Sequence, residues 1–276
     1  MPPPAIITLT TDFGLVDAYV ASMKGVILSL NPNVLLADVS HSIMPRRIEQ
    51  AAFLLESACR YYPADAIHIA VVDPGVGTER TAIALQAPGG TFVGPDNGVL
   101  SAALPGAVRS RAAEGGDRVR LPEDVSGVAL TSGRYHHQPV SGTFHGRDIF
   151  APAAAHLSLH VPLTELGEAI DEMFVLPPFR APRQPDGSFW GRVIHIDAFG
   201  NLITDIHGDD TASRRVTVEI ADQQIEGVDH TYSYSGERRL TALVSSYGFL
   251  EIALPGGSAA HELCVEIGEP VKVSGA

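Results

Sequence analysis

The residues best suited to chemistry stand in a loop that follows a buried strand. The apolar run 66–72 predicts a strand buried on both faces, and the chain then breaks into Asp-Pro-Gly-Val-Gly-Thr-Glu-Arg at 73–80. In open α/β sheets, ligands bind beyond the carboxyl ends of the strands, which is where Asp73 would lie. A carboxylate there, with the guanidinium of Arg80 seven residues later, can orient a polar reactant. The alternative is an ordinary solvated Asp-Pro-Gly turn.

Further loops at predicted strand ends also gather polar residues: 12–14, 94–98, 144–148, 197–201 and 245–248. If the sheet is parallel, the loops at 12–14 and 73–80 lie at the same edge. Each loop has a structural alternative: Asp12 could cap a helix, His145 could be a core histidine, and Arg147 and Asp148 could form a salt bridge. Their joint occurrence at strand ends favours a functional site.

Several common chemistries lack their motifs in this chain. The first strand is not followed by Gly-x-Gly-x-x-Gly, and neither a P-loop nor a Gly-x-Ser-x-Gly elbow occurs. His41, His136, His137 and His145 accompany many aspartates, but no His-x-His or His-Glu-x-x-His cluster exists. We therefore expect no metal site.

The elements that position these loops alternate between strand and helix. Strands are predicted at 5–11, 34–39 and 66–72, helices at 17–30 and 48–62, further strands at 81–85 and 91–93, and a helix at 151–157. This alternation predicts right-handed crossovers and an α/β domain with a largely parallel central sheet flanked by helices.

Composition changes near the middle of the chain, which predicts two domains. We expect the α/β domain over 1–176, a proline-rich linker over 177–187, and an all-β barrel or sandwich over 188–276. Strands of the second domain are predicted at 191–196, 215–220, 240–244, 250–254 and 263–267.

Bulk composition narrows the class of partner. The chain has 276 residues and a formal net charge of −13, which argues against nucleic acid or an anionic membrane surface as the main partner. We find neither a signal peptide nor an apolar run long enough to span a membrane, and we expect a cytoplasmic protein. Cys59 and Cys264 lie in apolar surroundings and are expected to be buried structural thiols.

Five motifs follow one another over nearly the whole chain: Thr11-Asp12-Phe13-Gly14, Asp73-Pro74-Gly75-Val76-Gly77, Gly94-Pro95-Asp96-Asn97-Gly98, Thr143-Phe144-His145-Gly146-Arg147-Asp148 and Phe199-Gly200-Asn201. Together they resemble the S-adenosylmethionine hydroxide adenosyltransferase family, the hydrolytic relatives of the S-adenosylmethionine-dependent fluorinase and chlorinase. The resemblance implies an N-terminal α/β domain and a C-terminal β-barrel-like domain. It also implies a homotrimer that binds S-adenosylmethionine between one subunit's N-terminal domain and its neighbour's C-terminal domain.

The implied reaction is hydrolysis of S-adenosyl-L-methionine to adenosine and L-methionine, without a cofactor. By the resemblance, Asp73, Arg80 and His145 position the attacking water, and Asp12 holds the ribose hydroxyls. The residue types fit these roles, because a carboxylate can accept hydrogen bonds from water or from two vicinal hydroxyls. Which group finally takes the proton from water is left open.

The resemblance places the rest of the substrate on other residues. Asp197 and Ser246 would bind the methionine amino group, with Asp17 a weaker candidate for the same end. Phe199 would pack on the purine or methionine portion, and Asn201 would contact the adenine edge.

The branch of the family is indicated by a few positions. The halogenating enzymes place Tyr and Thr where this chain has Asp73 and Val76, and a fluorinase-type insertion after the strand at 81–85 is missing here. At the position of Gly146 the fluorinase has Ser and the chlorinase has Gly, so this residue does not exclude a chlorinase. The alternatives to a hydrolase are therefore a chlorinase, or a non-catalytic protein that binds S-adenosylmethionine or adenosine.

Overall fold

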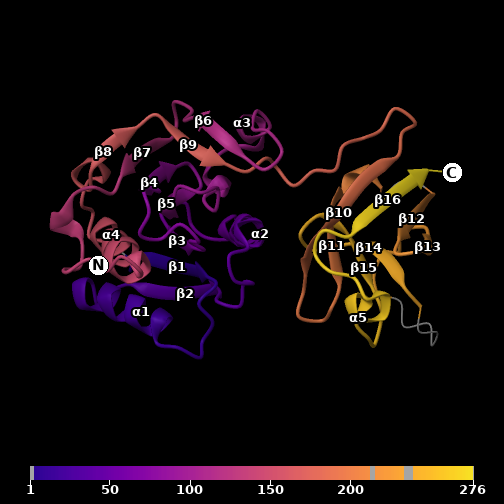
Figure 1. Cartoon of the computed structure of the whole chain (residues 1–276), viewed down its shortest axis with the longest axis horizontal. Helices are drawn as coiled ribbons and strands as arrows, with labels where there is room; N and C mark the ends of the chain where they lie inside the picture. The colour runs from indigo at the N-terminus through magenta and orange to yellow at the C-terminus, as the bar shows by residue number, and fades with distance from the viewer. Residues whose placement is uncertain (1–2, 212–214, 233–238, 276) are drawn as a thin grey trace. The chain divides into compact units, whose positions relative to one another are not determined.

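The computed structural model describes residues 3–211, 215–232 and 239–275, and the chain folds as two compact units (Figure 1). The first unit runs to Pro178 and the second begins at Phe179, so the boundary falls within the predicted linker. The first two residues, on which the signal-peptide expectation partly rests, lie outside the described residues.

A seven-stranded mixed sheet forms the centre of the first unit in the part of the chain that the structure describes. Its spatial order is β2-β1-β3-β5-β4-β7-β8. The strands are β1 (Ile6–Thr11), β2 (Leu35–Ser40), β3 (Ile67–Val71), β4 (Ala82–Ala87), β5 (Gly90–Pro95), β7 (Ser126–Ala129) and β8 (Glu168–Ile170). The first four in spatial order are parallel and the others are antiparallel, which confirms the predicted fold class. A separate ribbon pairs β6 (Asp117–Arg120) with β9 (Glu172–Val175), and sequence analysis predicted neither strand.

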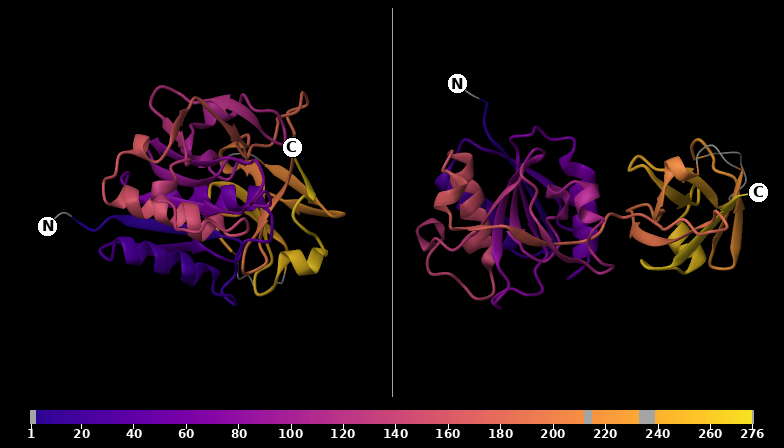
Figure 2. Two further views of the ribbon diagram at one scale, coloured as in Figure 1. Left: turned by 60° about the vertical axis from the view of Figure 1, so that its left-hand side comes forward. Right: turned by 90° about the horizontal axis from the view of Figure 1, so that it is seen from above.

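Helices cover both faces of this sheet (Figure 2). They are α1 (Tyr19–Leu30), α2 (Ile48–Cys59), the short α3 (Gly106–Arg109) and α4 (Ala151–Ser158). Side chains alternate across β3, so Ile67, Ile69 and Val71 face one hydrophobic core with α1 and α4. Ala70 faces the other core, which includes α2. The run at 66–72 is apolar except for His68, and all of it is buried because both faces of the strand are covered.

The first predicted helix is present as α1, and its buried positions follow a helical period. Val20, Met23 and Ile27 are buried at helical spacing, whereas Leu30 is partly exposed at the end of the helix. The helix begins at Tyr19, two residues later than predicted, and it ends before Asn31. The Asn31 side chain accepts a hydrogen bond from the Asn33 backbone N–H, which stabilises the turn out of the helix.

The second unit is a nearly closed, barrel-like antiparallel sheet of seven strands over the residues described. Its spatial order is β13-β12-β16-β10-β11-β15-β14. The strands are β10 (Phe189–Ile196), β11 (Leu202–His207), β12 (Val216–Ile220), β13 (Gln223–Glu226), β14 (Thr241–Val244), β15 (Phe249–Ala253) and β16 (Pro270–Gly275). A bridge between Asp229 and Leu243 joins the segment after β13 to β14 at the other end of the sheet. The predicted all-β second domain is confirmed.

The predicted strand at 263–267 is wrong. Leu263 is instead the last residue of a short helix, α5 (Ala259–Leu263), residues 264–267 lie in the turn after it, and the last strand lies further on as β16. The side chain of Ser258 accepts a hydrogen bond from the backbone N–H of His261 and so caps the helix start. Cys264 ends the helix in a left-handed conformation with φ of 53°.

The expectation of two buried thiols also fails. Cys264 is exposed, because it occupies the surface turn at the end of α5, and Cys59 is only half-buried at the end of α2. Both thiols are free. No helix among the residues described combines the length and apolar character that crossing a bilayer requires.

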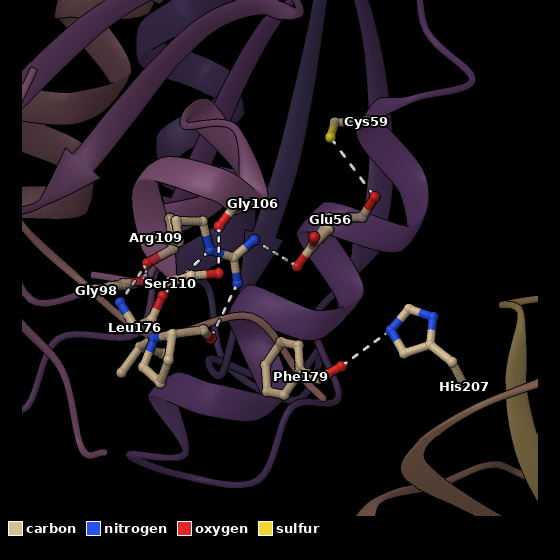
Figure 3. A network of polar contacts seen from close by, with 11 residues as sticks. Glu56, Cys59, Gly98, Gly106, Arg109, Ser110, Leu176, Phe179 and His207 are labelled. Atoms are coloured by element: carbon tan, nitrogen blue, oxygen red, sulfur yellow. Dashed lines mark hydrogen bonds and ion pairs between the residues drawn. The ribbon is translucent and has the colours of Figure 1, made fainter. Parts of the chain in front are cut away.

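The end of the first unit is anchored by a buried arginine. Arg109, on α3, is 1% exposed, and its guanidinium donates to the carbonyls of Leu176 and Pro177 at 3.1 and 3.2 Å. Its third nitrogen lies 2.9 Å from a carboxylate oxygen of Glu56 on α2. Figure 3 shows the guanidinium between Glu56 and the segment that holds Leu176. One cation thus ties α2, α3 and the last residues of the unit together.

Arg109→Met should therefore lower the free energy of unfolding by about 3 kcal/mol, because two carbonyls and a carboxylate lose their shared donor. Urea denaturation measures this change. Arg120→Met is the matched control, since Arg120 and its partner Asp171 are 82% and 81% exposed. That variant should change stability by no more than about 0.5 kcal/mol. Equal effects of the two substitutions would contradict the anchoring role.

Candidate active site

Parallel pairing of β1 with β3 brings the first two polar loops together. Thr11, the last residue of β1, is in register with Val71, the last residue of β3. Asp12 and Asp73 follow these strands at the same edge of the sheet, as the sequence predicted. The pairing joins residues sixty positions apart in the chain.

A cavity of about 210 Å³ lies at this edge. Its lining comes from the polar loops at 12–14, 73–80 and 144–148 and from residues beside them: Asp12, Phe13, Arg46, Val71, Asp73, Pro74, Val76, Thr143, Phe144, His145 and Gly146. A larger hollow of about 750 Å³ lies on the second unit beside Trp190 and Lys272, and it contains none of the predicted site residues.

Asp73, Arg80 and His145 form one hydrogen-bonded group beside the cavity. The guanidinium of Arg80 donates from Nε to Oδ1 of Asp73 at 2.9 Å and from Nη2 to Oδ2, which makes a bidentate pair. The side chains of Asp73 and Arg80 are 5% and 10% exposed. Nη2 of Arg80 also lies 2.9 Å from Nδ1 of His145. The structure brings together the three residues that the sequence placed in catalysis.

The contact with Arg80 fixes the protonation of His145. A guanidinium nitrogen can only donate, so Nδ1 of His145 accepts and the neutral ring carries its proton on Nε2. Burial and the adjacent charge of Arg80 lower the pKa of His145 below its ordinary value, against smaller opposing effects of Asp73 and Asp148. The neutral ring can therefore donate a hydrogen bond from Nε2 while it accepts one from Arg80.

Two loops approach closely enough to make this group. Gly77 has a φ of +75°, and a Cβ at this position would lie 2.2 Å from the carbonyl oxygen of Gly142. Only glycine allows the loop at 73–80 to meet the segment that precedes His145. The side chain of Asn97 donates to the carbonyl of Val72 at 2.9 Å and holds the residue before Asp73. The loop at 94–98 is visible in the sequence, but this role of Asn97 is not.

Asp12 is held by a backbone group that the sequence did not reveal. Its Oδ2 accepts a hydrogen bond of 2.9 Å from the backbone N–H of Arg46, so Asp12 does not cap α1. Arg46 has a φ of 66°, a left-handed conformation that is strained for a residue with a side chain. Nothing in the sequence marks this strain, because no glycine or asparagine occupies the position. Asp17 lies exposed in the loop between Asp12 and α1.

A π-helical turn over Gly146–Phe150 follows His145. Asp148 is fully buried there and accepts from Arg147 and from the backbone N–H of Ser141 at 2.9 Å. Burial alone would raise the pKa of Asp148, but the bonds from Arg147 and Ser141 hold it below its ordinary value. Arg147 and Asp148 form the structural pair that the sequence predicted.

The histidines that had no assigned role support the same loop. Nδ1 of His137 lies 3.3 Å from Oδ1 of Asp148, and the backbone N–H of His137 donates to the carbonyl of Asp148. Nε2 of His136 lies 3.1 Å from the carbonyl oxygen of Leu130. In the described residues no group of three or more His, Cys, Asp or Glu side chains could hold a metal ion.

The remaining predicted residues lie in the second unit. Asp197 accepts from the backbone N–H groups of Phe199 and Asn201 at 2.9 Å, and the Asn201 side chain donates to its other oxygen at 3.0 Å. This turn leaves Phe199 78% exposed and Asn201 buried. Ser246 is exposed in the turn between β14 and β15.

A buried carboxyl beside this turn was missed. Glu251, on β15, is 3% exposed and accepts a hydrogen bond of 2.6 Å from the hydroxyl of Tyr232. Burial raises the pKa of Glu251; the Tyr232 bond opposes this shift, and the nearby charge of Asp197 adds to it. In the sequence Glu251 is a single acid within an alternating strand, which gives no sign of burial.

An α/β unit with an aspartate–arginine–histidine group at a strand edge, joined to a barrel-like β unit, defines the class of protein. Residues 7–167 match the model of the SAM hydroxide adenosyltransferase N-terminal domain, and residues 191–272 match that of the C-terminal domain. The chain belongs to the S-adenosylmethionine hydroxide adenosyltransferase family, as the motifs predicted.

Individual relatives cover the whole chain. A protein of Salinispora tropica named (R)-S-adenosyl-L-methionine hydrolase is 38% identical over 99% of both chains. A fluorinase of Actinopolyspora mzabensis is 26% identical over 98% of this chain and 97% of its own. The crystal structure of an uncharacterized conserved protein from Thermotoga maritima has a TM-score of 0.81 and 30% identity, covering 97% of this chain and 99% of that one.

The ion pair between Asp73 and Arg80 beside the cavity gives a second prediction. Arg80→Met should lower the free energy of unfolding by about 3–5 kcal/mol, because it leaves the carboxylate of Asp73 buried without its partner. Urea denaturation measures the loss. The double variant Asp73→Asn/Arg80→Met should be more stable than Arg80→Met alone, since no charge is left unpaired. A double variant at least as unstable as the single one would contradict this account.

Proposed function

We propose that the protein hydrolyses S-adenosyl-L-methionine to adenosine and L-methionine. The observation that carries the proposal is the Asp73–Arg80–His145 group in the wall of the cavity that Asp12 also lines. Full-length relatives that are 32–38% identical carry the name (R)-S-adenosyl-L-methionine hydrolase, which supports the same activity.

The reaction is an in-line displacement at the ribose C5′. The oxygen of water forms a bond to C5′ while the bond from C5′ to the sulfonium breaks, and methionine leaves with the electron pair. The leaving group is already cationic, so no cofactor is required. The difficult partner is the nucleophile, because hydroxide is scarce near neutral pH. The protein contributes by holding water in line and excluding bulk solvent.

The geometry divides this work among three side chains. Asp73 accepts a hydrogen bond from the attacking water through lone pairs that Arg80 does not use. His145 carries its proton on Nε2, so it donates to the water and orients it rather than removing a proton. Nη1 of Arg80 is buried and without a partner among the described residues, which leaves one more donor at the group. Asp73 is thus the only one of the three that can accept the proton.

The remaining residues bind the parts of the substrate that do not react. Asp12 holds the ribose hydroxyls, with its carboxylate fixed by the Arg46 N–H. Asp197 and Ser246 bind the methionine amino group, with Asp17 as a further contact. The exposed ring of Phe199 packs on the ligand, and Asn201 contacts the adenine edge.

We further propose a homotrimer in which the first unit of one subunit and the second unit of its neighbour complete each site. The cavity of about 210 Å³ is smaller than the roughly 300–1,000 Å³ typical of pockets that enclose a drug-sized ligand. Leu15 and Val16, on the loop after Asp12, are 73% and 98% exposed. Phe199 in the second unit is 78% exposed. A neighbouring chain that covers these apolar side chains would also enlarge the enclosure.

We propose a cytoplasmic location, because both cysteines are free thiols and a reducing compartment keeps them so.

Asp73→Asn should lower kcat by at least about 100-fold, because the amide cannot take a proton from water. The dissociation constant for S-adenosylmethionine should change by less than about threefold, since the binding contacts lie elsewhere. Chromatography of released adenosine and titration calorimetry measure the two quantities. Asp96→Asn is the matched control: Asp96 is a buried carboxylate that pairs with Arg118 outside the cavity, and its loss should leave kcat within about twofold. Full turnover by Asp73→Asn would refute its role.

The pH profile should report the neutral form of His145. When the ring takes a proton on Nδ1, it can no longer accept from Arg80, so activity falls as pH drops through the pKa of His145. Because that pKa lies below the ordinary 6.5, activity should persist through pH 6.5 and fall only in more acidic solution. Initial rates between about pH 4.5 and pH 8 test this. His145→Gln should lack that acid limb; an unchanged limb in the variant would assign it to another group.

The runner-up activity is chlorination, which Gly146 permits. Asp73, Val76 and the short turn between β4 and β5 favour water. Incubation with S-adenosylmethionine and chloride or fluoride, followed by mass detection, should yield adenosine as the main product. A 5′-halogenated nucleoside in excess of adenosine would overturn the assignment. A protein that only binds the ligand would release neither product.

A further inference from the structure

A chain of polar contacts lies directly behind the loop of Asp12. Oγ1 of Thr11, at the end of β1, lies 2.8 Å from Nδ1 of His41 in the segment after β2. Nε2 of His41 lies 3.0 Å from Oδ1 of Asp38, within ion-pair distance although not aligned for a hydrogen bond. Nζ of Lys24, on α1, lies 2.7 Å from the other oxygen of Asp38.

Thr11 does not itself meet a substrate. Its side chain is fully buried and it does not line the cavity, so its hydroxyl is not available as a nucleophile. The oxygen accepts a hydrogen bond from the backbone N–H of Phe13 at 3.2 Å. Its own proton is then free to be donated to Nδ1 of His41, which leaves the ring proton of neutral His41 on Nε2, 3.0 Å from Oδ1 of Asp38.

These contacts hold the backbone on both sides of Asp12. Thr11, before it, is bound by the ring of His41, and Phe13, after it, is bound by the Thr11 hydroxyl. The backbone N–H of Gly14 donates to the carbonyl of His41 at 2.8 Å. Five residues beyond His41, the N–H of Arg46 binds the carboxylate of Asp12 itself. The segment 41–46 therefore holds both the backbone around Asp12 and its carboxylate.

We infer that His41 is a positioning residue, which acts through Thr11 to fix the carboxylate of Asp12 for the two ribose hydroxyls. The inference rests on the proposed function in one respect, the role of Asp12 on the ribose. His41 is 5% exposed and absent from the cavity lining, so it acts without touching the substrate.

The test compares adenosine with 2′-deoxyadenosine as competitive inhibitors of S-adenosylmethionine hydrolysis. A fixed Asp12 should favour adenosine by about tenfold, because the deoxy compound leaves one carboxylate contact unmade. In His41→Ala this ratio should fall below about threefold, and KM for the substrate should rise more than kcat falls. His41→Asn should restore most of the ratio, since its amide oxygen can accept from Thr11 near the place of Nδ1.

A second buried threonine–histidine pair on the same strand supplies the control. Oγ1 of Thr8, also on β1, lies 2.9 Å from Nδ1 of His68 on β3, and both residues are fully buried away from the cavity. His68→Ala should lower the melting temperature at least as much as His41→Ala and leave the inhibitor ratio unchanged. Comparing the two variants thus separates the effect of general destabilisation from the effect of displacing Asp12.

The outcomes are distinct. If His41→Ala retains the wild-type ratio, or if His68→Ala lowers the ratio equally, the positioning role is overturned. If His41→Ala does not fold, His41→Asn and a Thr11→Val variant carry the same comparison, with loss of the ratio expected only in Thr11→Val. If the wild type releases no adenosine, the proposed function fails. Calorimetric titration with the two nucleosides then still tests whether His41 sets Asp12.

Discussion

The parallel pairing of β1 with β3 is the constraint on which the site depends. It places Thr11 beside Val71, so that Asp12 and Asp73 emerge at one edge of the sheet although sixty residues separate them. Both strands are buried, and the side chains of β3 divide between two hydrophobic cores on opposite faces of the sheet. A shift of one residue would exchange these faces and place side chains of the wrong size in each core. Core packing thereby fixes the relative position of two carboxylates that do not touch.

The electrostatics of the edge follow from the burial that this packing imposes. A carboxylate that is 5% exposed needs a partner, and Arg80 supplies a bidentate one from the far end of the same loop. The same guanidinium disfavours the cationic form of His145, since Nη2 donates to its ring. Arg80 thus orients both neighbours: Asp73 as a hydrogen-bond acceptor on one side and neutral His145 as a donor on the other. Such a pair gives little net stability, and its value lies in orienting polar groups before a ligand arrives.

Sequence patterns predict what depends on local composition and order. The buried run at 66–72, the glycine loop after it and the proximity of the loops at 12–14 and 73–80 all follow from periodicity and from the rules for parallel sheets. The left-handed Arg46 and the burial of Glu251 do not, because each depends on segments that fold against it from elsewhere. The strand predicted at 263–267 covers only the last residue of α5 and the turn after it, because a short apolar run does not by itself distinguish a strand from a helix end.

The two units differ in the charge that each offers, and this difference suits a cationic substrate. In the first unit Asp73 is paired with Arg80, so the carboxylate that would hold the attacking water carries a cationic partner. In the second unit Asp197 accepts from N–H donors of its own turn, and Glu251 lies near enough for the two carboxyls to affect each other. Tyr232 donates to Glu251 but carries no charge to offset Asp197. The ammonium group of a bound methionine moiety would relieve the repulsion between these two carboxyls. The sulfonium, in contrast, needs no anion beside it to leave as neutral methionine. A carboxylate without a cationic partner at the carbon end would instead stabilise the sulfonium and oppose its departure.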